Sequence, residues 1–250
     1  MSGHSKWATT KHQKAAKDKA RGKLFAKLIR QLEVAARDGG GDPEMNPTLR
    51  TMFDKARAAS VPMDTIERAI KRGTGELEGV RYEAVAYEGY APSGVAIIVE
   101  CLTDNRNRTG ADVRNIFSRN GGSMAEPGAV SWQFARRGVL TLPRGLDEDS
   151  IMEAALDAGA EDLADEQEHW VLTCAPGDLA AVREALGKAG MQADGAELAM
   201  MPSTSVPISE ESEARRVLRL IEALDEHDDV QEVWSNFDIP DAVLAVVAAE

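Results

Sequence analysis

The chain has 250 residues, enough for two or three domains of ~100 residues each, and its 43% hydrophobic and 28% charged residues are typical of a globular protein. Its net charge of −13 argues against nucleic-acid binding by the molecule as a whole. The two cysteines, Cys101 and Cys174, have no CxxC spacing, which excludes a cysteine-rich zinc site or disulfide framework. Because no signal-peptide or membrane-spanning segment is recognisable, we expect a cytoplasmic protein without membrane contact.

The charges are distributed unevenly along the chain. Residues 1–37 contain ten Lys/Arg and two acids, a net charge of +8, whereas residues 38–72 contain six of each. The remaining 178 residues therefore carry −21. This split predicts a cationic N-terminal region that meets a polyanion and an acidic body that repels one.

The first 79 residues are predicted to form three helices. Between residues 19 and 37, apolar residues recur with a period of 3.6 and cations occupy the opposite face. A second helix is expected from Asn46-Pro47 to about residue 59, with Asn46 as N-cap. A third is expected over 64–72, starting in a capping box formed by Asp64 and Glu67. The cations expected on the outer faces of the first and third helices are Lys19, Lys23, Lys27, Arg30, Arg37, Arg68, Lys71 and Arg72.

Alternating and apolar runs predict strands from residue 82 onward. The first group comprises strands 82–90 and 95–102, helix 108–119 and strand 130–134. The second comprises strand 138–143, helix 148–158, strands 161–165 and 169–174, helix 177–189 and strand 194–201, which is the β-α-β-β-α-β order of ferredoxin-like domains. An extended segment 205–208, helix 210–226 and strand 230–237 follow.

The last predicted helix and strand, 210–226 and 230–237, are too few to form a sheet of their own. Residues 80–135 contain several strands but lack a second helix to pack beside the helix 108–119. The simplest solution is a discontinuous domain, 80–135 plus 203–250, with residues 136–202 inserted as a ferredoxin-like domain. The predicted fold class is therefore α+β, with an N-terminal three-helix domain (1–79) followed by two ferredoxin-like α/β domains, one inserted in the other.

The densest cationic stretch lies at the N-terminus and is the first candidate site. Closely spaced cations can neutralise several phosphates and release counterions, and Trp7 offers a face for stacking on a base. A solvated basic face would produce the same pattern, so charge alone leaves both interpretations open. The candidate nucleic-acid-binding residues are His4, Lys6, Trp7, Lys11, His12, Lys14, Lys17, Lys19, Arg21, Lys23 and Lys27, together with Arg68, Lys71 and Arg72 of the third helix.

A second candidate site follows the strand 95–102 and opens the next helix. Backbone N–H groups at a helix N-terminus suit a phosphate. Ordinary capping by Asp104 or Asn105, with the arginines paired to nearby acids, would explain the same residues. The secondary phosphate-contact candidates are Asn105, Arg106, Asn107, Arg108 and Thr109.

Signatures of catalysis are missing from the sequence. The four histidines, His4, His12, His169 and His227, are scattered, and neither HExxH, GxSxG nor a phosphate-loop spacing occurs. We therefore predict no catalytic residues, no metal site and no cofactor.

Several sequence blocks resemble the YebC/PmpR family. They are Gly3-His4-Ser5-Lys6-Trp7 with Lys11-His12, the segment from Tyr87 to Ala96, Thr103 to Arg108, Gly121-Gly122, and Asn236-Phe237-Asp238. The similarity extends from residue 2 to about 241. It implies a helical domain and two α/β domains around a cleft, and regulation of gene expression rather than catalysis.

Three functions remain open at this point. The resemblance favours a DNA-binding transcriptional regulator, since bacterial members are usually described in that way. Mitochondrial relatives are translational activators and bacterial members have been tied to the ribosome, so a translation factor bound to ribosomal RNA is the alternative, although the aromatic RNP pattern is absent. A protein-interaction module acting through acidic surfaces is the third. The expected partners are DNA and/or ribosomal RNA, possibly within the ribosome; the sequence leaves the oligomeric state undecided.

Overall fold

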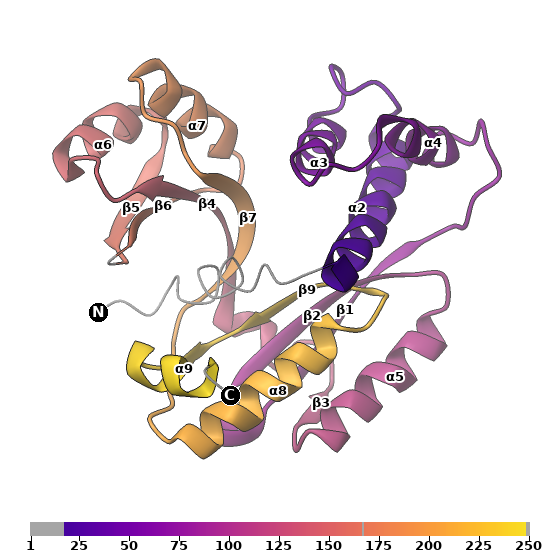
Figure 1. Ribbon diagram of the computed structural model, residues 1–250, viewed down its shortest axis with the longest axis vertical. Coiled ribbons are helices and arrows are strands. Elements are labelled where there is room, and N and C mark those ends of the chain that lie inside the picture. The colour runs from indigo at the N-terminus through magenta and orange to yellow at the C-terminus, as the bar shows by residue number, and fades with distance from the viewer. Residues whose placement is uncertain (1–17, 167, 249–250) are drawn as a thin grey trace. The chain divides into compact units, whose positions relative to one another are not determined.

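The computed structural model describes residues 18–166 and 168–248 (Figure 1). Within that range the chain forms two compact units, one of residues 18–129 with 210–233 and the other of residues 130–209 with 234–248. Helices come first and mixed helix–sheet segments follow, so the predicted α+β class is confirmed. The domain boundaries proposed after residues 79, 135 and 202 stay predictions.

The three predicted N-terminal helices are present. They are α2 (Asp18–Gly39), α3 (Pro47–Ala58) and α4 (Met63–Gly73). Asn46 caps α3 as expected, because its side chain accepts a hydrogen bond from the backbone N–H of Leu49 at 3.1 Å. The predicted capping box of α4 is wrong: Pro62 occupies the cap position without a side-chain hydrogen bond, and Asp64 pairs with Arg68 at 2.8 Å instead. The apolar faces of the helices share a core that includes Leu28, Leu32, Leu49 and Ile66.

The first unit also contains most of a four-stranded sheet. Its elements are β1 (Glu83–Tyr90), the short turn η1 (Pro92–Gly94), β2 (Ala96–Thr103), α5 (Arg106–Arg119), β3 (Ser123–Ala125), α8 (Glu211–Asp225) and β9 (Val230–Ser235). The strand order is β3-β1-β2-β9, with β1 antiparallel to both β2 and β3. Helices α5 and α8 pack beside each other (Figure 1). The strand β9 thus joins a sheet whose other strands precede it by a hundred residues or more.

The second unit carries the other four-stranded sheet. Its elements are η2 (Ser131–Gln133), β4 (Phe134–Pro143), α6 (Glu148–Ala155), η3 (Leu156–Ala158), β5 (Ala160–Asp165), β6 (His169–Cys174), α7 (Leu179–Lys188), β7 (Gly195–Pro202), β8 (Val206–Pro207), β10 (Phe237–Asp238) and α9 (Asp241–Ala248). The antiparallel order β5-β6-β4-β7 is the ferredoxin-like order that the sequence predicts. Its core includes Leu140, Ile151, Leu172 and Leu186.

One local prediction in this region is wrong, and a second is refined. Residues 130–134 alternate like a strand, yet the backbone N–H of Gln133 bonds to the carbonyl of Val130 at 2.9 Å and closes a 3₁₀ turn, so β4 begins only at Phe134. The predicted helix 148–158 has the predicted bounds, but it is α-helical only to Ala155 and ends in the 3₁₀ turn η3, after which Gly159 takes a left-handed φ of +104°.

A buried carboxylate joins the helical segment to the first sheet. The Asp229 side chain, only 5% exposed, accepts hydrogen bonds from Thr109 Oγ1 at 2.7 Å and Arg108 Nη2 at 2.9 Å. It also forms an ion pair with Arg30 of α2, with 3.3 Å between Nη1 and Oδ1. Its backbone carbonyl accepts the N–H of Leu102 at 2.9 Å. One residue therefore fastens α2, the start of α5 and the end of β2 together.

These contacts stabilise the ionised form of Asp229. Burial by itself raises the pKa of the carboxyl, but the hydrogen bonds from Thr109 and Arg108 and the charge of Arg30 outweigh it, and the pKa lies below its ordinary value. The hydrogen bonds to Asp229 and Asp104 likewise raise the pKa of Arg108. Because a lowered native pKa makes protonation unfavourable, this stabilisation is complete above about pH 4 and is lost as the pH falls toward the native pKa.

We predict that Asp229→Asn lowers the free energy of unfolding by about 2 kcal/mol at pH 7, since an amide has one acceptor oxygen in place of two and no charge to pair with the arginines. Urea denaturation measures the effect. Asp104→Asn removes the exposed partner of the same Arg108 and should lower the free energy of unfolding far less. The difference in the free energy of unfolding between wild type and Asp229→Asn should become smaller below pH 4. Equal losses in the two variants, or a gap independent of pH, would contradict this assignment.

The packing of α4 against α2 generates a second prediction. A methyl group at Gly73 would collide with the backbone carbonyl of Glu33 and lie 2.7 Å from Ala36 Cβ. Gly73→Ala should therefore lower the free energy of unfolding by about 2 kcal/mol. Gly22→Ala is the matched control in α2: with open space around it, this variant should raise stability by about 0.5–1 kcal/mol. Thermal unfolding of both variants tests this prediction. An unchanged stability of Gly73→Ala would show that α4 does not approach α2 this closely.

Candidate nucleic-acid interface

The cationic face of α2 lies against an acidic turn of the same unit. This acidic turn, residues 225–229, connects α8 to β9. Lys23 Nζ donates to the carbonyl of Glu226 at 2.8 Å, and Lys27 Nζ forms an ion pair with Asp225 at 2.8 Å. The Lys27 side chain is only 14% exposed. Both lysines, predicted as phosphate contacts, thus already have protein oxygens as partners.

Arg30 continues the same contact one turn further along α2. Besides its pair with Asp229, it donates to the carbonyl of Asp228, and its guanidinium lies 5.4 Å from the centre of the Tyr82 ring. Three successive cations on this face are therefore held by the acidic turn, which binds them as a run of phosphates would.

Most of the N-terminal candidates cannot be placed. His4, Lys6, Trp7, Lys11, His12, Lys14 and Lys17 lie outside the described residues, as do the side chains of Lys19 and Arg21. Their assignment as nucleic-acid contacts stays a prediction from sequence.

Two of the three cations predicted on the outer face of α4 are exposed. Arg68 pairs with Asp64 and Lys71 faces solvent. Arg72, also expected outward, instead turns toward Glu33 of α2, with 2.6 Å from Nε and 2.5 Å from Nη2 to the same Oε1 atom. Glu33 is buried, and a buried carboxylate requires such a partner. Sequence reasoning missed Glu33, although an acid beside Leu32 on an apolar helix face was the available signal.

The block 103–109 combines capping with ion pairing. Asn105 is the N-cap of α5 and accepts from the backbone N–H of Arg108 at 3.1 Å. The Arg108 side chain pairs with Asp104 at 2.7 Å as well as with the buried carboxylate of Asp229. Thr109 is buried and lies 2.7 Å from the Thr103 hydroxyl. Arg106 is the exposed cation of the block that has no ion pair to a described residue, and Asn107 beside it is exposed as well.

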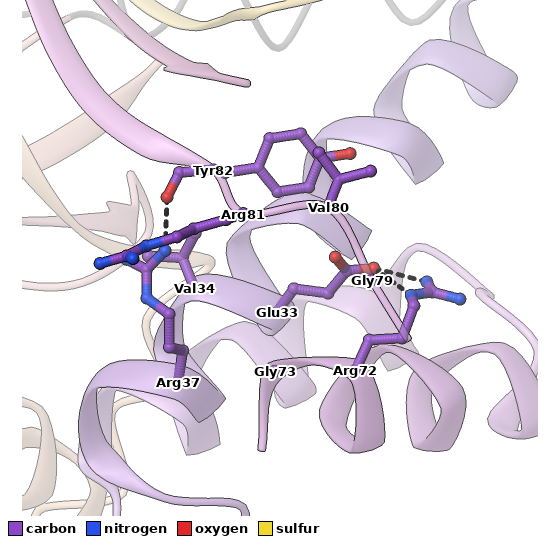
Figure 2. Close-up of a pocket in the computed structure, with 9 residues that line it drawn as sticks. All are labelled: Glu33, Val34, Arg37, Arg72, Gly73, Gly79, Val80, Arg81 and Tyr82. Carbon is purple, nitrogen blue, oxygen red and sulfur yellow. Dashed lines mark hydrogen bonds and ion pairs between the residues drawn. The ribbon is translucent and has the colours of Figure 1, made fainter. Parts of the chain in front are cut away.

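Figure 2 shows a pocket of about 120 Å³ where α2, α4 and the segment leading into β1 meet. We call it the arginine pocket; it is lined by Glu33, Val34, Arg37, Arg72, Gly73, Gly79, Val80, Arg81 and Tyr82. Arg37 donates to the carbonyl of Tyr82 and pairs with Asp38 at 2.8 Å. Its lining comes from three separate segments, so sequence patterns alone did not reveal it.

Neither cysteine is suited to nucleophilic chemistry. Burial raises the pKa of Cys101 to about 12 and also raises the pKa of Cys174. Among residues 18–166 and 168–248, His, Cys, Asp and Glu side chains form no group of three that could hold a metal ion. No helix in the described part of the chain is long and apolar enough to cross a membrane.

Comparison with known proteins identifies relatives along almost the whole chain. Residues 5–76 match the TACO1/YebC protein N-terminal domain, and residues 82–237 match the TACO1/YebC second and third domain. Similar curated proteins, each named "Probable transcriptional regulatory protein", come from Acidothermus cellulolyticus (57% identity, 99% of this chain and 100% of the relative), Thermobifida fusca (56%, 99% and 100%) and Halothermothrix orenii (52%, 100% and 100%).

A solved structure is similar too. The crystal structure of a conserved hypothetical protein from Aquifex aeolicus is 46% identical, covers 89% of this chain and 92% of its own, and superimposes with a TM-score of 0.80. The resemblance seen in the sequence blocks is thereby confirmed: the chain belongs to the TACO1/YebC family.

Proposed function

We propose that this chain is a non-enzymatic, DNA-binding regulator of transcription in the cytoplasm, and that residues 4–21 make its principal phosphate contacts. The regulatory role is supported by the name that its similar relatives carry. The site is supported by the charge of the N-terminal segment, since residues 1–22 contain six Lys/Arg and one acid.

The observation that carries this proposal is the pairing of α2 with the acidic turn. Lys23, Lys27 and Arg30 bind carboxylate and carbonyl oxygens of residues 225–229, and this anchors α2 to the body. These three cations are therefore already neutralised by protein oxygens, and in our proposal the cations that precede Lys23 in the sequence are the ones that bind phosphate. This supports a proposal in which the phosphate contacts come from residues 4–21 and not from Lys23, Lys27 and Arg30.

Helix α4 supplies secondary contacts in this proposal. Its pair between Arg68 and Asp64 is largely exposed, so it is worth little and a phosphate can replace the carboxylate. Lys71 is exposed on the same short helix. These two residues add affinity without determining which sequence is bound.

We predict that replacing Lys11, Lys14, Lys17 and Lys19 together by Gln weakens binding to duplex DNA and lowers the slope of log affinity against log salt by about three to four, because each lost phosphate contact removes ~0.9 of slope. Fluorescence anisotropy with a labelled duplex at several salt concentrations measures both quantities. The charge-matched control replaces Arg183, Lys188, Arg216 and Arg219 by Gln and should leave the slope unchanged.

If the slope of log affinity against log salt falls equally in both quadruple variants, the net charge of the protein, and not the N-terminal segment, determines binding. The same titration with a structured RNA tests the alternative partner. Tighter binding to RNA than to DNA at matched salt would overturn DNA as the working target, and would favour a ribosomal or messenger RNA role through the same cations.

A further inference from the structure

We propose that the arginine pocket is a binding site for one phosphate group. This chemistry is common to a phosphodiester of a bound nucleic acid and to a free phosphate monoester. The inference rests on the proposed function only for the first of these sources. The lining residues belong to segments 33–37, 72–73 and 79–82, and none of the pocket's arginines except Arg72 was a predicted contact.

The charges that line the pocket favour an anion. The lining contains three arginines, Arg37, Arg72 and Arg81, and one acid, Glu33, so it carries a net charge of +2. Asp38 pairs with Arg37 from outside the pocket and is itself well exposed. A phosphate monoester carries about −1.5 to −2 at neutral pH, which balances this lining.

The arginines of the pocket keep N–H donors that are not used in contacts within the described residues. Glu33 takes Nε and Nη2 of Arg72 with a single oxygen, so Nη1 of Arg72 has no partner among the described residues. Arg37 uses Nε and Nη1 on Asp38 and Tyr82, which leaves Nη2. The exposed Arg81 has no hydrogen bond or ion pair to any residue of the described chain. Planar guanidinium groups with free N–H donors match the oxygens of a phosphate.

Two of the arginine side chains in the pocket are preorganised. The buried Glu33 fixes the guanidinium of Arg72, and the carbonyl of Tyr82 fixes that of Arg37, as Figure 2 shows. Such prior ordering lowers the entropic cost of binding. The volume of about 120 Å³ is several times the roughly 15 Å³ that one water requires, which leaves room for a tetrahedral oxyanion.

The absence of side chains at one wall keeps the pocket open. Gly79 passes directly over the aliphatic stem of Arg72, and a Cβ atom added there would lie 3.0 Å from Arg72 Cβ and 3.3 Å from its Cδ. A larger residue at this position would press on the arginine that carries the free Nη1 donor. The glycine thus lets residues 79–82 line the pocket without displacing the Arg72 side chain.

Isothermal titration calorimetry of the full chain with inorganic phosphate, at constant ionic strength, tests the site. We expect Arg81→Gln to weaken phosphate binding about tenfold, because it removes a charged donor that has no structural partner. Arg119→Gln, which removes an exposed arginine of α5, should leave the affinity unchanged. No detectable phosphate binding by the wild type, or an equal loss in the two variants, would overturn the proposal. Since Arg81 is exposed, unfolding curves without phosphate should coincide with wild type.

Two further arms of the experiment identify the source of the phosphate. If a nucleic-acid backbone occupies the pocket, Arg81→Gln should lower the salt slope for duplex DNA by about one. If a free monoester occupies it, the variant should bind adenosine 5′-monophosphate about tenfold more weakly while its DNA slope stays unchanged. Failure of the wild type to bind DNA would overturn the proposed function alone, because the phosphate titration is independent of DNA.

Discussion

The carboxylate of Asp229 is the contact on which the arrangement of the first unit depends. It gathers a cation from α2 and two donors from the start of α5, while its own backbone extends the ladder of β2. A buried acid is unfavourable unless such partners surround it, so each partner is held in place by the need to satisfy the others. Asp229 therefore links α2 to the start of α5 and to the end of β2.

The acidic turn resolves an apparent conflict in the charge of the molecule. A chain of net charge −13 should avoid nucleic acid, yet its first 37 residues are strongly basic. Our proposal distinguishes two groups among these cations. Those from Lys23 to Arg30 serve the fold by pairing with residues 225–229, whereas those that precede them are assigned to binding in our proposal. The arginine pocket adds a second, smaller concentration of positive charge between α2 and α4.

Local patterns predicted most of the fold, and contacts across the chain account for what they missed. Periodicity of 3.6 and the Asn46 cap are short-range signals, so the three N-terminal helices and the ferredoxin-like order of the second sheet could be found. The strand β3 spans only three residues, too few to show alternation. Asn105 could be recognised as a cap, but its neighbour Arg108 pairs with a carboxylate 121 residues away. For the same reason the turn of Arg72 toward Glu33 could not be anticipated from α4 alone.

The most direct test of the central claim is to locate the bound nucleic acid on the protein. The full chain can be crosslinked to nucleic acid in living cells by ultraviolet light, digested, and the modified peptides identified by mass spectrometry. Our account predicts crosslinks concentrated within residues 4–21, with sequencing of the attached fragments enriched in promoter DNA. Crosslinks confined to the acidic segments after residue 130, with residues 4–21 unmodified, would contradict it.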